Sequence, residues 1–304
     1  MSFHFKVGVV TDVGKRRTNN EDCFAVDQDV GLFMVADGVG GHKAGNVAST
    51  MAIEIIKNSI HDYKGPLLGE YNEEFSQHTN RILHGIRLAN SAVYEAGQRH
   101  AEHHSMATTL ASVYINGDVM ALAHVGDSRI YRLRGACLQR LTVDHSLAEE
   151  QRLYGLVTEV AESPYKNAIT RALGAEERIL IDADEGVVLD GDKILLCTDG
   201  LTKMVEEEDV IRIILGAKDD PQKACEALVD TANDQGGTDN ITVILVQCEK
   251  SPRQVGLGAK VVLSILEGWR KIYSGIADCY RGKKGTTSLN TEDTKNKVTF
   301  IGDK

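Results

Sequence analysis

Two apolar segments of the chain end in the dipeptide Asp-Gly, and this repeated pattern constrains the fold more than any other feature. GLFMVADG ends on Asp37 and Gly38, and KILLCTDG ends on Asp199 and Gly200. Both segments are rich in Val, Ile and Leu, which is typical of strands buried in a sheet. Each Asp-Gly alone is compatible with a hairpin turn, or with a carboxylate mounted at a strand end beside a glycine that lets backbone approach a ligand.

Further strand-like and helical patterns surround these two segments. Strands are predicted at 6–12, 108–115, 119–129 and 241–247, and helices at 45–60, at 76–99 and over 207–233 with a restart at Pro221. Asn116, Gly117 and Asp118 lie between two of the strands, which is a strong hairpin signal. Because strands and helices do not alternate strictly, we expect an α+β fold of antiparallel sheets covered by helices.

The composition of the chain changes near residue 250. We expect a folded domain over 1–250, followed over 251–304 by a linker, an amphipathic helix and a polar disordered tail. The helix is predicted at 261–276, where Val, Ile, Leu and the single Trp269 trace one face. That face could pack on the folded domain, bind a partner protein or lie on a membrane surface.

The overall charge excludes one class of partner. The net charge is −10, which argues against the broad basic surface that nucleic acid requires. We find no signal-peptide pattern at the N-terminus and no apolar run long enough to span a membrane. A cytoplasmic location is therefore expected.

Acidic residues flank several of the predicted strands. Glu21 and Asp22 precede the strand CFAV, Asp127 follows VMALAHV, and Asp239 precedes ITVILV. In antiparallel sheets the end of one strand and the start of its neighbour share a rim, so these side chains could converge with those of the two Asp-Gly pairs. Carboxylates gathered in this way raise one another's pKa unless a cation binds them, and all-oxygen ligation suits Mg²⁺ or Mn²⁺.

Such a centre suits phosphoryl chemistry. Two metal ions that share a carboxylate can lower the pKa of a bridging water and offset the charge that develops on a phosphoryl group. Arg17 lies four residues before Glu21, and its guanidinium matches a phosphate bidentately. A lone arginine is more often a solvated surface residue, so its interpretation depends on the neighbouring carboxylates.

The motifs RRTNNED, ADGVGGHKAG, HVGDSRIYRLR, LTVDHS, NAITRALG, LLCTDGL and GGTDNITV follow one another along the chain. Together they resemble the motifs of the type 2C protein phosphatases, in the family's order, over about residues 5–248. The details resemble the bacterial branch. The resemblance implies a β-sandwich of two antiparallel sheets flanked by helices in four layers, with a flap over about 144–175 beside the active site.

The resemblance implies a metal-binding role for most of the matched acidic residues. Asp37 would bridge two Mn²⁺ or Mg²⁺ ions, and Gly38 would add its backbone carbonyl. Asp199 and Asp239 would complete the shell of the second ion. Asp127 would help to hold a third, weaker ion together with Asp199.

Other matched positions imply roles around the metals. Glu21 and Asp22 would hold metal-bound waters, and Arg17 would bind the substrate phosphate. The chain departs from eukaryotic members after the Asp-Gly, where Val39 replaces a histidine that could protonate the leaving group. His42 is a weaker candidate for that role, and water on a metal is the simplest substitute.

The implied activity is metal-dependent hydrolysis of phosphoserine and phosphothreonine in proteins, opposing a Ser/Thr kinase in signalling. Two alternatives stay open at this point. One is a non-catalytic regulator that keeps the fold and binds phosphoproteins or kinases, although the core positions from Asp37 to Asp239 retain acidic residues. The other is a hydrolase of small phosphates or nucleotides, for which no dinucleotide-binding motif is present.

Overall fold

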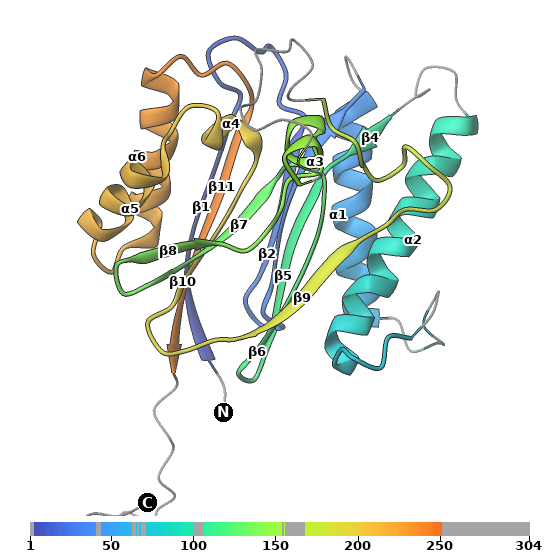
Figure 1. Ribbon diagram of the computed structural model, residues 1–304, viewed down its shortest axis with the longest axis horizontal. Helices are drawn as coiled ribbons and strands as arrows, with labels where there is room; N and C mark the ends of the chain where they lie inside the picture. Colours follow the sequence, from blue (N-terminus) through green and yellow to red (C-terminus); the bar gives the residue numbers. More distant parts are fainter. Residues whose placement is uncertain are drawn as a thin grey trace, which may run out of the picture. The chain divides into compact units, whose positions relative to one another are not determined.

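The computed structural model describes residues 3–40, 44–62, 65, 67, 71–99, 106–153, 155 and 168–250. The described residues of the first compact unit, Met1–Ser251, form two sheets with helices on their outer faces (Figure 1). The second unit is Pro252–Lys304. The predicted amphipathic helix at 261–276 and the polar tail lie outside the described residues, as does His42.

All neighbouring strands in the first sheet are antiparallel. Its order is β1 (Phe3–Asp12), β11 (Ile241–Lys250), β10 (Lys193–Cys197), β7 (Arg129–Arg134) and β8 (Cys137–Arg140). The C-terminal strand of the unit therefore lies inside the sheet, between β1 and β10.

The second sheet is antiparallel as well. Its order is β2 (Asp22–Asp27), β3 (Leu32–Val39), β5 (Leu110–Asn116), β6 (Val119–Val125) and β9 (Asp182–Val187), and the short β4 (Ala107–Thr108) pairs with the end of β3. The Asn-Gly-Asp hairpin predicted between 115 and 119 joins β5 to β6. One predicted strand, 119–129, is divided in two, because the chain turns at Gly126 with a φ of 100°.

Alternation of side chains along the strands builds the layers. In β3, Leu32 and Met34 pack in the cluster that contacts α1 (Ala44–Asp62) and α2 (Gln77–Arg99), while Phe33 packs between the sheets. In β10, Ile194 packs between the sheets, and Leu195 faces the other helices. Strands apolar on both faces are expected where a sheet is covered on both sides.

The helices on the first sheet are α4 (Asp199–Thr202), α5 (Glu207–Gly216) and α6 (Pro221–Asp234). Pro221 is at the first turn of α6, where its missing N–H costs nothing, and Asp220 caps the helix by accepting from the Lys223 amide at 3.2 Å. The predicted restart of the helix at Pro221 is confirmed. The predicted fold, two antiparallel sheets flanked by helices, is confirmed too.

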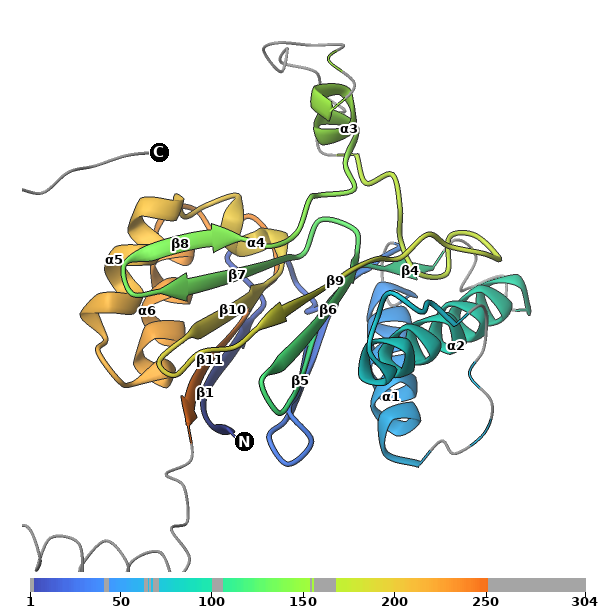
Figure 2. The same ribbon diagram turned by 60° about the horizontal axis from the view of Figure 1, so that its bottom comes forward.

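The flap predicted over 144–175 is described in part. Its helix α3 (Leu147–Leu153) stands out from the sheets in Figure 2. At its base, the Leu147 amide donates to the Ala168 carbonyl at 3.0 Å, and Thr170 donates to His145 at 2.9 Å. The backbone segments 145–147 and 168–170 are therefore paired at the base of α3, with Ser146 opposite Ile169. Ile169 also lines the pocket described in the next section.

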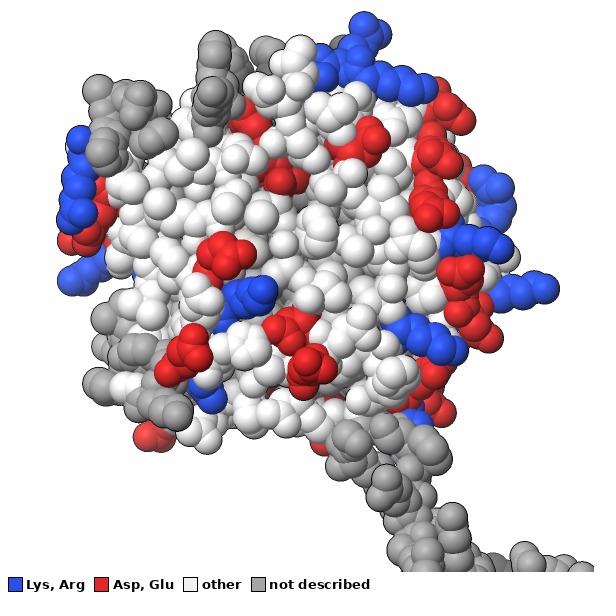
Figure 3. Space-filling view, turned by 180° about the vertical axis from the view of Figure 1, so that it is seen from behind, with Lys and Arg blue, Asp and Glu red and all other residues white. Residues whose placement is uncertain are grey.

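The described surface carries charged side chains of both signs. On the face drawn in Figure 3, the described Lys and Arg side chains are interspersed with Asp and Glu and form no continuous basic patch. In the described part of the chain, no helix combines the length and apolarity needed to cross a membrane.

Candidate metal centre

The register of β2 and β3 places two acidic residues side by side. Asp22 at the start of β2 is the direct partner of Asp37 near the end of β3. The Asp37 amide donates to the Thr109 hydroxyl at 2.9 Å, and the Asp37 carbonyl accepts from the Thr108 hydroxyl at 2.9 Å. The backbone N–H and C=O of Asp37 are therefore both fixed by threonine side chains of the adjacent segment, as a preorganised ligand requires.

Asp22 joins the two sheets. One of its oxygens accepts from the Thr198 hydroxyl at 2.9 Å and from the Thr242 hydroxyl at 2.7 Å, and both threonines belong to the opposite sheet layer. The side chain is buried, and its other oxygen, Oδ1, has no hydrogen-bond partner. Burial raises the pKa of Asp22 to about 7 despite the two hydroxyl donors.

Asp199 starts a helix and is not in a hairpin turn. The strand predicted at 193–200 ends at Cys197, and Asp199 opens the single turn of α4. Gly200 is required there, because a Cβ at this position would lie 1.9 Å from the Asn240 carbonyl oxygen. This close approach sets Asp199 beside Asp239, the second residue before β11.

Arg17 binds Asp239 bidentately. Its Nε lies 2.9 Å from Asp239 Oδ1, and its second guanidinium nitrogen donates to Oδ2 at 3.0 Å. Asn240 fixes the loop that carries Arg17, since its side chain accepts from the Glu21 amide at 2.9 Å and donates to the carbonyls of Val13 and Asn19. The arginine is thus held at the same rim as the carboxylates.

Gly38 allows the first helix to begin against the carboxylate rim. Its amide donates to the Glu21 carbonyl at 3.2 Å, and a Cβ on Gly38 would lie 2.2 Å from the Gly45 carbonyl oxygen. A Cβ on Gly45 would in turn meet a carboxylate oxygen of Glu21 at 2.3 Å. The start of α1 therefore closes on Glu21 and Gly38 only because both glycines lack side chains.

These residues surround one pocket of about 500 Å³. Its lining includes Arg17, Glu21, Asp37, Gly38, Asp127, Asp199, Lys203, Asp239 and Asn240. The structure therefore brings together seven of the eight predicted site residues on the pocket wall. The remaining one, Asp22, is buried next to Asp37 and does not line the pocket.

The electrostatics of the pocket favour a cation. Burial and the neighbouring carboxylates raise the pKa of Asp37 well above its usual range, and burial raises the pKa of Asp127 to about 7. Burial also raises the pKa of Asp199, although Lys203 opposes this shift. Asp127 and Asp199 each have a buried oxygen without a hydrogen-bond partner, as Asp22 does. Ionised carboxylates in this setting need a cation, and an all-oxygen donor set fits Mn²⁺ or Mg²⁺.

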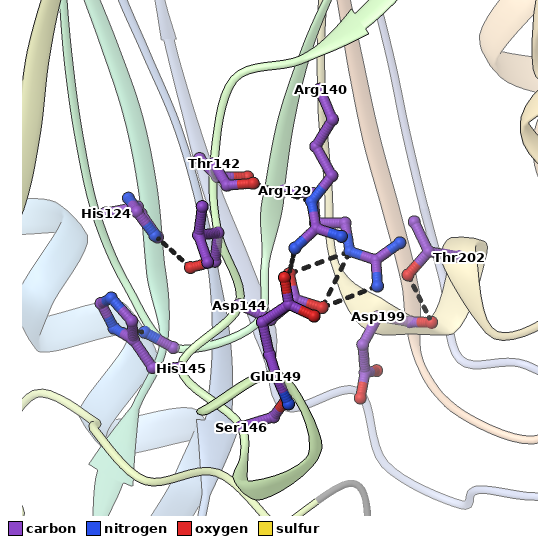
Figure 4. Close-up of polar contacts among 12 residues, drawn as sticks. His124, Arg129, Arg140, Thr142, Asp144, His145, Ser146, Glu149, Asp199 and Thr202 are labelled. Atoms are coloured by element: carbon purple, nitrogen blue, oxygen red, sulfur yellow. Dashed lines mark hydrogen bonds and ion pairs between the residues drawn. The ribbon is translucent and has the colours of Figure 1, made fainter. Parts of the chain in front are cut away.

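Asp127 lies in a loop that is tied to the base of the flap. Two residues along, Arg129 binds Asp144 bidentately, with Nε–Oδ1 at 2.9 Å and a terminal nitrogen 2.6 Å from Oδ2 (Figure 4). Arg140 binds the same carboxylate at 2.9 Å. The strand that follows the Asp127 loop is therefore tied to the base of the flap through Asp144.

His145 also lies at the base of the flap, and it does not line the pocket. Its Nδ1 accepts from the Gly126 amide at 3.1 Å, and its Nε2 lies 3.2 Å from Asp182 and 3.2 Å from Arg171. The His124 ring stacks on it with centroids 4.7 Å apart and donates through Nε2 to Val143 at 2.8 Å. These contacts fit an anchor for the flap. The side chains of His124, His145 and Asp182 lie close enough together to hold a metal ion. However, Arg171 already binds Asp182 at 2.8 Å.

Four residues of the site were not expected from the sequence. Thr198, Thr242 and Asn240 hold Asp22 and the Arg17 loop, and Lys203 places its ammonium against Asp199 and Asp239. Each lies within four residues of a predicted site residue in the sequence. Their closeness in sequence to the predicted site residues was thus the one signal that could have found them. That closeness does not distinguish a residue that contacts the site from one that does not.

Comparisons with known proteins agree with this geometry. The profile of the family described as protein phosphatase 2C matches residues 14–241. That match covers well over half of the chain and includes every predicted site residue. The chain belongs to the protein phosphatase 2C family, and it is therefore a phosphatase.

Individual relatives point to its bacterial branch. The chain is 37% identical over 248 residues to protein phosphatase PhpP of Streptococcus pneumoniae serotype 2, covering 79% of this chain and 96% of that protein. It is 35% identical over 242 residues to the serine/threonine phosphatase stp of Listeria monocytogenes serotype 4b, covering 78% and 93%. The catalytic domain of the serine/threonine protein phosphatase PstP, solved with two manganese ions, superposes with a TM-score of 0.70 at 27% identity, covering 82% and 100%.

Proposed function

We propose that the protein removes phosphate from phosphoserine and phosphothreonine in other proteins, with two Mn²⁺ or Mg²⁺ ions held by the pocket. The observation that carries this proposal is the convergence of Asp37, Asp127, Asp199 and Asp239 on one pocket. Asp127 and Asp199 each have a buried oxygen without a hydrogen-bond partner there. The names of stp, a serine/threonine phosphatase, and of PstP, a serine/threonine protein phosphatase, support the substrate class. No observation on the described residues favours the non-catalytic alternative.

In this proposal the carboxylates of Asp37, Asp199 and Asp239 and the backbone carbonyl of Gly38 would hold the two ions. Glu21 and Asp22 orient the surrounding water, Asp22 from its buried position beside Asp37. Divalent ions bound here supply a hydroxide at neutral pH and offset the charge on the phosphoryl oxygens. We confine the proposal to two ions, because Lys203 already faces Asp127 and Asp199.

Arg17 has the substrate phosphate as its target. Its guanidinium fork now binds Asp239, and a phosphate offers the same pair of oxygens. We propose that Arg17 exchanges Asp239 for the phosphate when substrate binds. The proton donor for the leaving group is not assigned, since no described lining residue of the pocket is a histidine.

The direct test is release of inorganic phosphate from a phosphothreonine peptide after treatment with EDTA. Activity should be absent until Mn²⁺ or Mg²⁺ is added. Asp37→Ala and Asp239→Ala should each reduce turnover on the order of a thousandfold, because several kcal/mol of charge stabilisation are lost. Asp230→Ala, the same change at an exposed position on α6, is the control. Equal activity in all of these proteins would refute the proposal.

In the cell we propose that the enzyme opposes a Ser/Thr kinase in the cytoplasm. The five described cysteines are free thiols, and three of them are buried, which suits a reducing compartment. Phosphoproteomes of cells carrying the wild-type or the Asp239→Ala protein should differ at serine and threonine sites. Contact with a partner or a membrane through 261–276 stays a prediction.

A further inference from the structure

Lys203 places a positive charge inside the carboxylate cluster. Its ammonium contacts Asp199 Oδ2 and lies 3.4 Å from Asp239 Oδ2. Its side chain is one-third exposed, at 33%, and it is the one lysine among the described residues that line the pocket. The cluster thus contains a cation that belongs to the chain itself.

The position of Lys203 is fixed by the helix that begins at Asp199. Lys203 follows the last residue of α4, and its amide donates to the Asp199 carbonyl at 2.9 Å. A spacing of four residues puts both side chains on the same face of a helical turn. Because Gly200 packs α4 against Asn240, this turn cannot move away from the rim without losing its contact with β11.

An ammonium group and a divalent ion compete for the same carboxylate oxygens. The ammonium has no lone pair with which to ligate a metal, and its charge repels one placed within a few ångströms. The charge of Lys203 also acts on Asp127, in addition to the two residues that it contacts. It therefore faces the carboxylates on the side of the pocket where Asp127 and Asp199 meet.

We propose that Lys203 is a tethered cation of the metal centre: its ammonium occupies the Asp199 side of the site and competes with one divalent ion for that carboxylate. Lys203 is then a positioning residue that limits the number or the affinity of the ions bound. The proposal rests on the proposed function in one respect, since it requires divalent ions to bind at this pocket.

The test is calorimetric titration of the EDTA-treated, dialysed full-length protein with Mn²⁺. Lys203→Met should bind the weakest Mn²⁺ at least about tenfold more tightly than wild type, or bind one additional ion, because a repulsive charge is gone. Lys203→Arg keeps the charge and should behave like wild type. Lys6→Met removes the same charge on β1, where Lys6 pairs with Glu249, and should change nothing.

Two results would overturn the inference. One is equal stoichiometry and affinity in wild type and Lys203→Met, and the other is weaker binding in Lys203→Met. A circular dichroism melt of each variant verifies that it is folded. A failure of the proposed function is distinguishable, because it would leave a protein that binds Mn²⁺ with the predicted differences but releases no phosphate from a phosphothreonine peptide.

Discussion

Asp22 is a buried carboxylate at the junction of the two sheets. It joins the two sheets through Thr198 and Thr242, yet one of its oxygens is buried without a partner. A buried carboxylate in this state favours its protonated form. Asp127 has a similar environment, because it is also buried and has one oxygen without a hydrogen-bond partner.

These carboxylates predict an unusual pH dependence of stability without metal. Burial raises the pKa of both Asp22 and Asp127 to about 7, whereas an unfolded aspartate has a pKa of about 3.9. Because the folded state binds these protons more tightly, their contribution to stability is full below pH ~4 and is lost as pH rises through ~7. In EDTA, the urea midpoint should therefore fall between pH 5 and pH 8.

Asp127→Asn provides the matched control for that prediction, because an amide cannot ionise. In EDTA the variant should gain stability over wild type as pH rises from 5 to 8, by at most about 3 kcal/mol, because the linkage acts only up to the folded pKa of about 7. Urea unfolding of both proteins across this range measures the difference. A difference that stays constant with pH, or shrinks, would contradict the account.

The acidic residues of the pocket could be predicted from the sequence, but the residues that contact them could not. Asp37 and Asp199 follow apolar runs, so their placement at a rim could be predicted from strand pattern alone. The two Asp-Gly pairs still differ: Gly38 continues a strand, while Gly200 lies in a helical turn. That difference depends on Asn240, which is far away in sequence, and no local pattern records it.

Among the elements, α1 and β3 depend on each other through two glycines. A Cβ on Gly38 would meet the carbonyl oxygen of Gly45 at 2.2 Å and that of Glu21 at 2.7 Å, and both are backbone atoms that cannot rotate away. The start of α1 would have to shift, and Glu21 with it. The geometry of the metal centre is thus coupled to the packing of one helix.

Gly38→Ala should therefore lower both stability and Mn²⁺ affinity. We expect a loss of roughly 1–3 kcal/mol in the free energy of unfolding, as for other overpacked sites. Gly216→Ala is the control, since nothing lies within 4 Å of a Cβ at the end of α5. It should be neutral or stabilising by about 0.5–1 kcal/mol. Denaturant titrations and Mn²⁺ calorimetry that found the two variants alike would refute the coupling.

Elements with a clear period were predicted well. The helices predicted at 45–60 and 76–99 correspond to α1 and α2, and the break before Pro221 separates α5 from α6. The strand β9 was missed, because its sequence DADEGV has no apolar alternation. It forms at the edge of a sheet by pairing with β6, so tertiary context outweighs its low β-propensity.

For the whole molecule, the position of β11 sets where the catalytic unit must end. This strand lies between β1 and β10 and pairs with both, so the first sheet is not complete until Lys250. The layers were predictable from the succession of strands and helices. The order of strands in each sheet was not, because pairings such as β1 with β11 join the two ends of the unit.

A chain cut after Lys250 should therefore fold and keep its activity toward a small phosphate ester, within about twofold of the full-length protein, as expected of an independent domain. A chain cut before Ile241 should not fold, since it lacks β11. Turnover of the ester and the melting curve of each chain measure this. Loss of Mn²⁺-dependent turnover in the longer of the two chains would show that residues 251–304 belong to the catalytic unit.

The most direct test of the account is the anomalous scattering of manganese in crystals of the protein grown with Mn²⁺. We expect two peaks that share the carboxylate of Asp37, one of them also bound by Asp199 and Asp239. The absence of any peak at Asp37, or a peak found only among His124, His145 and Asp182, would contradict it.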